Sequence, residues 1–199
     1  LVEIMPPDLL PLFAKDKNIK TAIVNHAGRQ YNIRFNTLHK PFDNPKVRQA
    51  VLYALSQKEF LDVNVGNPEF YKECRSVFPC GSPLESTKGW EDKVSGNIAK
   101  AKELLAASGY DGTPAVFLHQ TDTAGHNNLA TVGKAQLEKI GLKVDLQPMD
   151  WQTLVTRRTK KEPLDKGGWS AFFTSWPATM VAAPLRTRLT RCPKENSRA

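Results

Sequence analysis

"RFNTLHKPFDNPKVRQAVLYALSQKEF", residues 34–60, is the stretch that decides the fold of this chain. It begins as the end of a strand and passes through a turn rich in proline, aspartate and asparagine. Asn44 then provides a helix N-cap, and Pro45 suits the first helical position, where its missing N–H costs nothing. The apolar residues that follow recur every three or four positions and share one helix face: Val47, Val51, Leu52 and Leu55. The pattern predicts a strand, a turn and an amphipathic helix.

The rest of the chain alternates between strand-like and helix-like segments. Strands are predicted over 18–25, 30–36, 114–119, 142–150 and 167–176. Helices are predicted over 6–15, 45–55, 57–63, 97–110, 124–140 and 151–161, and several of them end at a glycine. Strands that alternate with helices favour an α/β fold, in which right-handed crossovers place helices against a sheet.

The composition is typical of a single globular domain. The chain has 199 residues, of which 40% are hydrophobic and 24% charged, so there is enough apolar material for one core. No run of about 18 apolar residues occurs, and we expect no membrane-spanning segment. No signal peptide is visible, and residues 1–13 look like a strand end that runs into a helix. We therefore expect a mature or trimmed fragment, whose start says little about its compartment.

The formal net charge of +8 is unevenly distributed. Residues 186–199 carry five basic side chains and one glutamate, so half of the net charge lies in this short tail. A basic tail can bind nucleic acid or acidic membranes by electrostatic attraction. No aromatic residue is interleaved to stack on bases, which favours a solvated end instead. We expect residues 177–199 to form an atypical, disordered basic tail.

Two of the three cysteines lie in an irregular, Gly- and Pro-rich segment, residues 64–97. Cys74 and Cys80 are six positions apart, and a disulfide that closes so short a loop is sterically feasible in an oxidising compartment. Free thiols are the alternative. Zinc is disfavoured because no second Cys/His pair at ligand spacing follows. Cys192, in the basic tail, has no visible partner.

The opening stretch resembles the signature of extracytoplasmic solute-binding proteins of the peptide/nickel family, family 5, which serve ATP-binding-cassette importers. That signature is an asparagine-ending strand, a Pro-Phe-Asp turn, and a helix that opens with Val-Arg-Gln-Ala. The matching residues here are Asn36, Thr37, Pro41, Phe42, Asp43, Val47, Arg48, Gln49 and Ala50. Three later blocks are similar in order and spacing: "AKAKELLAASGYDG" (99–112), "KAQLEKIGLKVDLQPMDW" (134–151) and "GGWSAFFTSW" (167–176). The resemblance covers about residues 1–176.

This resemblance implies a fold and a role. Complete members are more than twice as long and close two lobes on a ligand. Residues 1–176 would be the C-terminal lobe, a periplasmic-binding-protein-like mixed sheet flanked by helices. The implied ligand is a peptide or similar small solute, the implied partner is a membrane permease, and the location is periplasmic or lipid-anchored. A lone lobe cannot bury most of a ligand, so we expect it to bind weakly or not at all, and its exposed cleft face would invite self-association.

The same resemblance indicates the ligand-binding residues. Trp151 matches a tryptophan at the end of the alternating strand, and Trp176 matches one that the last strand brings to the cleft. Arg158, two helical turns after Trp151, matches an arginine that faces the ligand in some peptide-binding members. Thr179 stands where those members place an aspartate for the peptide's amino terminus. Either the ligand lacks a free amino terminus, or the chain after Trp176 is not native in frame.

Other functions have weaker support in the sequence. His119 and His126 are seven positions apart, but no carboxylate pattern accompanies them, so a metal site is not expected. No catalytic spacing or phosphate-binding loop occurs, so we expect neither an enzyme nor a cofactor. Basic residues on the helix over 151–161 (Arg157, Arg158, Lys160 and Lys161) leave a nucleic-acid-binding domain as an alternative. A truncated product without independent function is a third reading.

Overall fold

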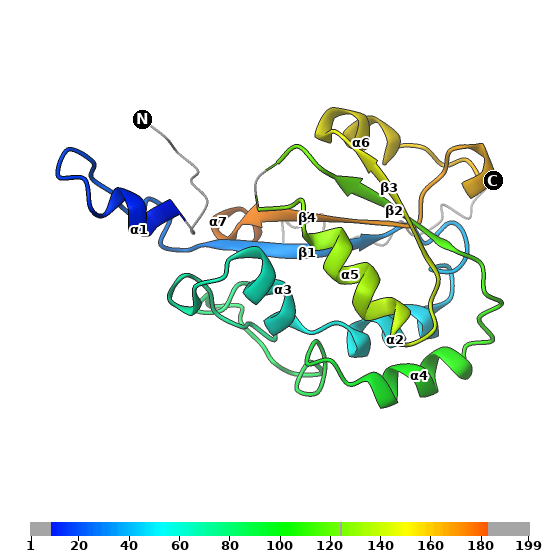
Figure 1. Cartoon of the computed structure of the whole chain (residues 1–199). Helices are drawn as coiled ribbons and strands as arrows, with labels where there is room; N and C mark the ends of the chain where they lie inside the picture. The colour runs from blue at the N-terminus through cyan, green and yellow to red at the C-terminus, as the bar shows by residue number, and fades with distance from the viewer. Residues whose placement is uncertain (1–8, 124, 183–199) are drawn as a thin grey trace, which may run out of the picture.

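The computed structural model describes residues 9–123 and 125–182, which form a four-stranded mixed sheet with helices on both faces (Figure 1). The strands are β1 (Arg29–Phe35), β2 (Ala115–Gln120), β3 (Val144–Met149) and β4 (Ala171–Pro177). Their order across the sheet is β1-β4-β2-β3. Strand β2 runs parallel to both β3 and β4, and β1 pairs antiparallel with β4. In the described part of the chain, no helix is long and apolar enough to cross a membrane.

The helices are short and fall into two groups. The α-helices are α1 (Leu10–Phe13), α2 (Pro45–Ala54), α3 (Gln57–Asn64), α4 (Ile98–Ala106), α5 (Leu129–Glu138), α6 (Trp151–Arg157) and α7 (Ala178–Val181). Two 3₁₀ turns, η2 (Pro68–Phe70) and η3 (Leu164–Lys166), lie in connections. Helices α2 to α5 lie on one side of the sheet, which we call the first face, and α6 lies on the second face (Figure 1).

The core is divided by the sheet because successive strand residues point to opposite faces. Phe117 and Phe173 point to the first face, into a cluster with the apolar sides of α2, α4 and α5. Leu118 and Phe172 point to the second face, into a smaller cluster with Leu154 of α6 and with Trp169. The first face carries most of the buried apolar side chains, and the second face is covered over only part of its area by α6.

The opening stretch builds the fold from its own side chains. Asn36 is buried at the end of β1, where its Nδ2 donates to the carbonyl of Trp169 at 2.9 Å and its Oδ1 accepts from Leu38 N at 3.1 Å. Phe42 is fully buried, with ring centroids 4.6 Å from Phe35 and 6.2 Å from Phe117. Asn36 thereby joins the end of β1 to Trp169, just before β4, and Phe42 joins it to Phe117 of β2. They act on the packing of the domain and not on a ligand.

The turn into α2 is held in the same way. Asn44 caps the helix by accepting from Lys46 N at 2.9 Å, as the sequence predicts, and its Nδ2 donates to the carbonyl of Ser108 after α4. The Arg48 guanidinium donates to the carbonyls of Phe42 and Asp43. The signature is recognisable because each of these side chains satisfies a backbone group that burial would otherwise leave unpaired.

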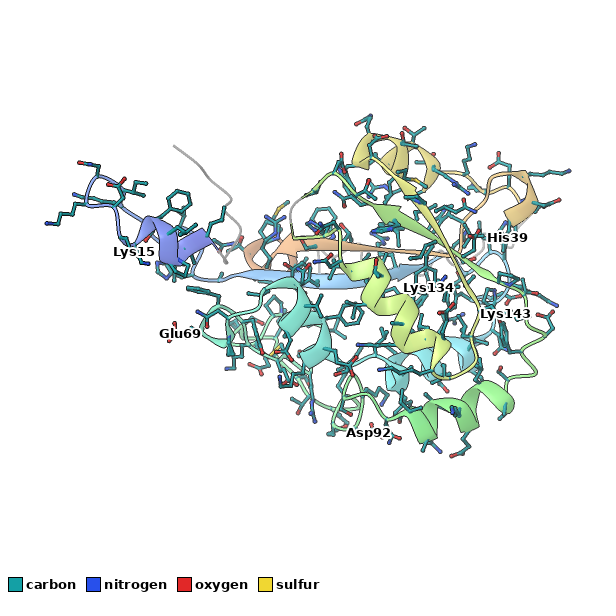
Figure 2. All side chains as sticks on the ribbon, in the orientation of Figure 1. Lys15, His39, Glu69, Asp92, Lys134 and Lys143 are labelled. Carbon is teal, nitrogen blue, oxygen red and sulfur yellow. A yellow bond between two sulfur atoms is a disulfide. The ribbon has the colours of Figure 1, made fainter. Side chains whose placement is uncertain are left out.

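One predicted strand was wrong. Residues 18–25 form no strand; they belong to an arm, residues 9–27, that projects away from the sheet, with Lys15 marking it in Figure 2. Ile23 and Val24 are 59% and 86% exposed. A strand needs a partner edge for its backbone groups, and no described strand lies beside this arm. Only α1 forms within the helix predicted over 6–15, of which residues 6–8 lie outside the described part.

Three predicted helices are shorter than expected. Helix α4 ends at Ala106 and not at residue 110, and the turn that follows it contains Gly109, whose φ is +70°. Helix α5 begins at Leu129 and not near residue 124, because Gly125 has a φ of +79° and the segment before α5 is a turn. Helix α6 ends at Arg157 and not at residue 161. Pro163 follows, and a proline disfavours helical geometry in the residue before it.

The irregular segment and the tail complete the description. Cys74 and Cys80 form a disulfide with Cα atoms 5.7 Å apart, and the side-chain amide of Gln57 makes hydrogen bonds with both backbone groups of Cys74. The first residues of the tail, which was predicted to be disordered, are folded: they form α7, in which Ala178 and Val181 are buried. Residues 183–199, with most of the basic charge and Cys192, lie outside the described residues.

Candidate functional site

The candidate site lies where three parallel strands end. Because β2 runs parallel to β3 and β4, the carboxyl ends of all three lie at one edge, which we call the carboxyl edge. Ligands of open α/β sheets commonly bind outside such an edge. In the register, Leu118 is level with Gln147 on one side and Phe172 on the other. Beyond these pairs β2 ends at Gln120 and β3 at Met149, whereas β4 continues along β1 to Pro177.

Trp151 is the first residue of α6 and is held by two carboxylates. Asp150 is the N-cap: its carboxylate accepts from Thr153 N at 2.9 Å and from Thr153 Oγ1 at 2.6 Å, and these bonds lower the pKa of Asp150. Asp122, just beyond β2, accepts the Trp151 N–H with both oxygens, at 3.0 and 3.1 Å. The half-buried indole packs against the second-face cluster. Its position is thus fixed by backbone, cap and packing together.

Arg158 reaches back along α6 to Trp151. Its Cζ lies 5.5 Å from the centre of the Trp151 ring and 5.9 Å from that of Phe172. A guanidinium over aromatic rings is attracted by their negative faces. Within the described part of the chain, no carboxylate or carbonyl accepts a hydrogen bond from this guanidinium. The structure therefore presents five N–H donors held in place by rings, a geometry that suits a carboxylate.

Trp176 ends β4 next to the edge strand, opposite Gln30 of β1. Its side chain is half-buried, and its Nε1 is screened from solvent with no hydrogen-bond acceptor among the described residues. The same is true of Oε1 of Gln30, whose Nε2 donates to Val77 O at 3.1 Å. Buried polar groups normally find partners, so two unpaired ones beside each other mark an incomplete surface.

Of the four predicted residues, the structure brings only Trp151 and Arg158 into contact. Strand β2 separates β3, which leads into Trp151, from β4, which carries Trp176, and β2 pairs with β4 only at Phe117–Ala171 and Leu118–Phe172. Thr179 is exposed on α7, directly after Trp176.

The comparisons with known proteins decide the family. The model of bacterial extracellular solute-binding proteins, family 5 Middle, matches residues 1–192. The chain belongs to this family. The match runs past Trp176, where the sequence motifs of the family end. A probable peptide ABC transporter periplasmic-binding protein, y4tO of Sinorhizobium fredii, is 40% identical over 171 residues, which cover 85% of this chain and 32% of that protein. The glutathione-binding protein GsiB of Escherichia coli K12 is 29% identical over 180 residues, 88% of this chain and 33% of GsiB.

Solved structures agree on the fold. The putative peptide-binding protein AppA from Clostridium difficile matches with a TM-score of 0.71 and 22% identity, over 87% of this chain and 35% of AppA. The binding protein DppA from Helicobacter pylori, in complex with the peptide STSA, matches with a TM-score of 0.68 and 23% identity, over 91% of this chain and 33% of DppA. The chain thus spans about a third of the length of these relatives.

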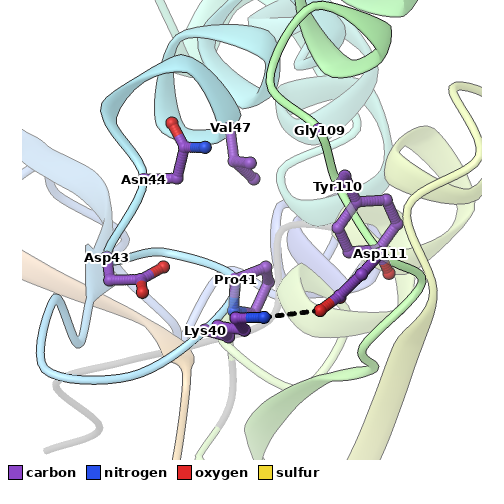
Figure 3. Close-up of a pocket in the computed structure, with 8 residues that line it drawn as sticks. All are labelled: Lys40, Pro41, Asp43, Asn44, Val47, Gly109, Tyr110 and Asp111. Atoms are coloured by element: carbon purple, nitrogen blue, oxygen red, sulfur yellow. Dashed lines mark hydrogen bonds and ion pairs between the residues drawn. The ribbon is translucent and has the colours of Figure 1, made fainter.

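Two hollows in the described part of the chain are lined by other residues. One, of about 340 Å³, lies between the turn before α2 and the end of α4, where the Lys40 Nζ is 2.7 Å from the Asp111 carboxylate (Figure 3). Hydrogen bonds from Lys40 and Thr113 hold the pKa of Asp111 well below its usual range. The other, of about 290 Å³, is on the outer side of α6. Neither is lined by Trp151, Arg158, Trp176 or Thr179.

Sequence reasoning missed two residues of the site. Asp122 and Phe172 complete the surroundings of Trp151. The only sequence signal for Asp122 is its place two residues after β2, and the only signal for Phe172 is its place on the second face of β4. The ring of His119 lies 2.7 Å from the carbonyl of Asn127, and His126 Nε2 lies 2.8 Å from Ser175 Oγ. No group of three metal-ligating side chains is found among the described residues.

Proposed function

We propose that this chain is the C-terminal lobe of an extracytoplasmic solute-binding protein that delivers peptides or similar small solutes to an ATP-binding-cassette importer. Family membership supports the solute-binding role, and the names of its relatives support peptides as the solute class. The observation that carries the proposal for this chain's own residues is the Arg158 guanidinium, held over Trp151 and Phe172 without an acceptor.

The mechanism would be closure of two lobes on the solute. Trp151 and Trp176 would provide apolar walls, and Arg158 would bind a carboxylate through a planar pair of N–H donors. Contacts made only in the closed form would favour that form when solute is bound. The second lobe would cover the carboxyl edge and supply partners for the unpaired groups of Trp176 and Gln30.

The location and the partner follow from the same role. A membrane permease would receive the solute, and the protein would act in the periplasm or anchored outside the membrane. The disulfide between Cys74 and Cys80 supports an oxidising compartment. The role is binding and transfer of an unchanged solute, so we propose no catalytic activity.

The nucleic-acid alternative receives less support. The Arg157 guanidinium donates to the carbonyls of Gly167 and Gly168, at 3.1 Å each, and Arg158 is stacked on two rings. Of the four cations on this helix and its end, Lys160 and Lys161 remain exposed. Two lysines form a small electrostatic footprint for a phosphate backbone.

Native mass spectrometry of the chain with a mixture of di-, tri- and tetrapeptides tests the proposal. We expect 1:1 adducts that weaken in Arg158→Ala and Trp151→Leu but persist in Lys160→Ala, a charge-matched control on the same helix end. Adducts that survive both site substitutions unchanged would overturn the proposal.

A further inference from the structure

The disulfide of the irregular segment is linked to the strand beside Trp176. Cys74 and Cys80 close a loop, residues 74–80, in which Val77 is the middle residue. The carbonyl of Val77 accepts a hydrogen bond from Gln30 Nε2 at 3.1 Å. Gln30 lies opposite Trp176 in the ladder between β1 and β4. Directly opposite residues of an antiparallel pair point to the same face, with Cβ atoms about 5 Å apart. Gln30 therefore joins the disulfide loop to the surroundings of the indole.

The shape of this loop depends on its closure. No helix or strand forms between η2 and α4, so no regular backbone ladder holds the loop. One end is fixed to the start of α3, where the side-chain amide of Gln57 bonds to the N–H and the carbonyl of Cys74 at 2.8 and 2.7 Å. The disulfide brings the other end, Cys80, back to the same point. Val77 is thus held on a ring whose two ends meet at α3.

The other hydrogen bonds of the loop do not reach the sheet. Ser76 is buried, and its Oγ accepts from Ser86 N at 3.1 Å. The Arg75 guanidinium donates to the carbonyl of Glu91 at 2.8 Å. Both partners belong to the irregular segment itself. Among the hydrogen bonds of the described residues, the one from Gln30 is therefore the link between the loop and the sheet.

The disulfide is open to reduction because both cysteines are partly exposed. A dithiol attacks one sulfur as its thiolate and forms a mixed disulfide, and its second thiol then displaces the cysteine. In total, two electrons and two protons convert the Cys74–Cys80 disulfide into two thiols, and the dithiol becomes a cyclic disulfide. The opened loop regains conformational freedom. The bond between Val77 and Gln30 then forms only at the cost of that freedom.

We propose that the Cys74–Cys80 disulfide is a redox control of the Trp176 side of the solute site and acts through Val77 and Gln30. This inference rests on the proposed solute-binding function and adds its regulation. Gln30 is a positioning residue, since its bond to the loop fixes the orientation of its whole amide beside the indole. Reduction releases this amide and weakens the site. The binding form is the oxidised one, which an oxidising compartment favours.

The indole N–H signal of Trp176 tests the coupling in the ¹⁵N-labelled chain, with Cys192→Ser as the background so that only one cysteine pair reacts. We expect the signal of Trp176 to move when dithiothreitol reduces the disulfide. The signal of Trp169, whose Nε1 donates to Lys160 O at 3.2 Å, should stay in place and report that the second-face cluster remains folded. A Trp176 signal that stays in place on reduction would overturn the proposal.

Two substitutions on the same face of β1 locate the path. Gln30→Leu keeps the size of the side chain but removes the donor to Val77, so the Trp176 signal should no longer respond to reduction. Asn32→Leu is the matched control, because the Asn32 amide bonds to the carbonyl of Gln30 within β1 and not to the loop. It should leave the response intact. A response that persists in Gln30→Leu would exclude Gln30 as the link.

Titration of the same samples with trialanine measures the effect on binding. We expect reduction to raise the dissociation constant about fivefold, the effect of losing one neutral hydrogen bond, and Gln30→Leu to show the weaker value in both redox states. Equal affinity of the oxidised and reduced chains would overturn the control while leaving the solute site in place. The Trp176 signal decides the coupling without any peptide, so failure of this inference is distinguishable from failure of the solute site.

Discussion

Gly133 provides the most quantitative test of how the first face is packed. It lies in the middle of α5, against the ring of Phe173 from β4. A Cβ at this position would lie 2.6 Å from Phe173 Cζ and 2.7 Å from Cε2. The ring cannot withdraw easily, because its centroid is already 5.4 Å from that of Phe60 and 6.1 Å from that of Phe117. The glycine is therefore required by close approach of a buried ring.

Two opposing effects decide the outcome of Gly133→Ala. Replacing glycine by alanine within a helix stabilises by about 1 kcal/mol. Forcing an extra methyl group into a packed core costs about 1–3 kcal/mol. Since the contacts are far below van der Waals distance, we expect the second effect to dominate and the free energy of unfolding to fall by about 1 kcal/mol. Urea unfolding followed by circular dichroism measures this change.

A second background isolates the contact with the ring. Phe173→Leu removes both crowded ring atoms, so that Gly133→Ala in this background should stabilise by about 1 kcal/mol, the helix effect alone. The coupling energy between the two substitutions would then be about 2 kcal/mol. Stabilisation by Gly133→Ala in the unmodified chain, with no coupling, would show that α5 does not press on Phe173 and would refute the packing described here.

Three further predictions concern other parts of the fold. Asn36→Ala leaves the buried carbonyl of Trp169 and the partly buried N–H of Leu38 without their partner and should lower the free energy of unfolding by about 1–3 kcal/mol in urea unfolding; a loss below about 0.5 kcal/mol would contradict its role. Replacement of both Cys74 and Cys80 by serine should cost about 2 kcal/mol, from the entropy of so short a closed loop, and an unchanged urea midpoint would oppose this. Lys40→Met should raise the pKa of Asp111, measured by carboxyl ¹³C NMR, back toward the ordinary aspartate value. Because the pKa of Asp111 is lower in the folded than in the unfolded chain, its interaction with Lys40 stabilises the fold above the unfolded pKa of about 4, and this stabilisation is lost as the pH falls through the folded pKa. If the pKa of Asp111 does not move in Lys40→Met, the ion pair is excluded as the cause of its lowered value.

The elements with strong local signals were predictable from the sequence. The turn into α2 carries its own N-cap, Asn44, and a proline at the first helical position, so its start needs no information from distant residues. Strands β2 and β4 are almost continuously buried, and their apolar runs reflect this. The arm over 9–27 shows the limit of such signals, because the apolar residues within 18–25 suggest a strand, but no described strand lies beside them to pair with.

Contacts of the site within one helix were predictable from the sequence, whereas contacts between segments that follow different strands were not. Trp151 and Arg158 are seven residues apart on one helix, and spacing together with family resemblance pointed to their contact. Asp122 reaches Trp151 from a different strand, 29 residues away in sequence. That contact depends on the register between β2 and β3, which no local pattern specifies.

The four tryptophans allow the central claim to be tested in one spectrum. Each indole N–H gives its own NMR signal, and addition of a bound peptide should move those of Trp151 and Trp176. The signal of Trp169, whose Nε1 donates to Lys160 O at 3.2 Å beneath α6, and that of Trp90 in the irregular segment should stay in place. If a peptide binds, as shown by shifts elsewhere in the chain, yet the Trp151 and Trp176 signals do not move, the carboxyl edge is not the solute site.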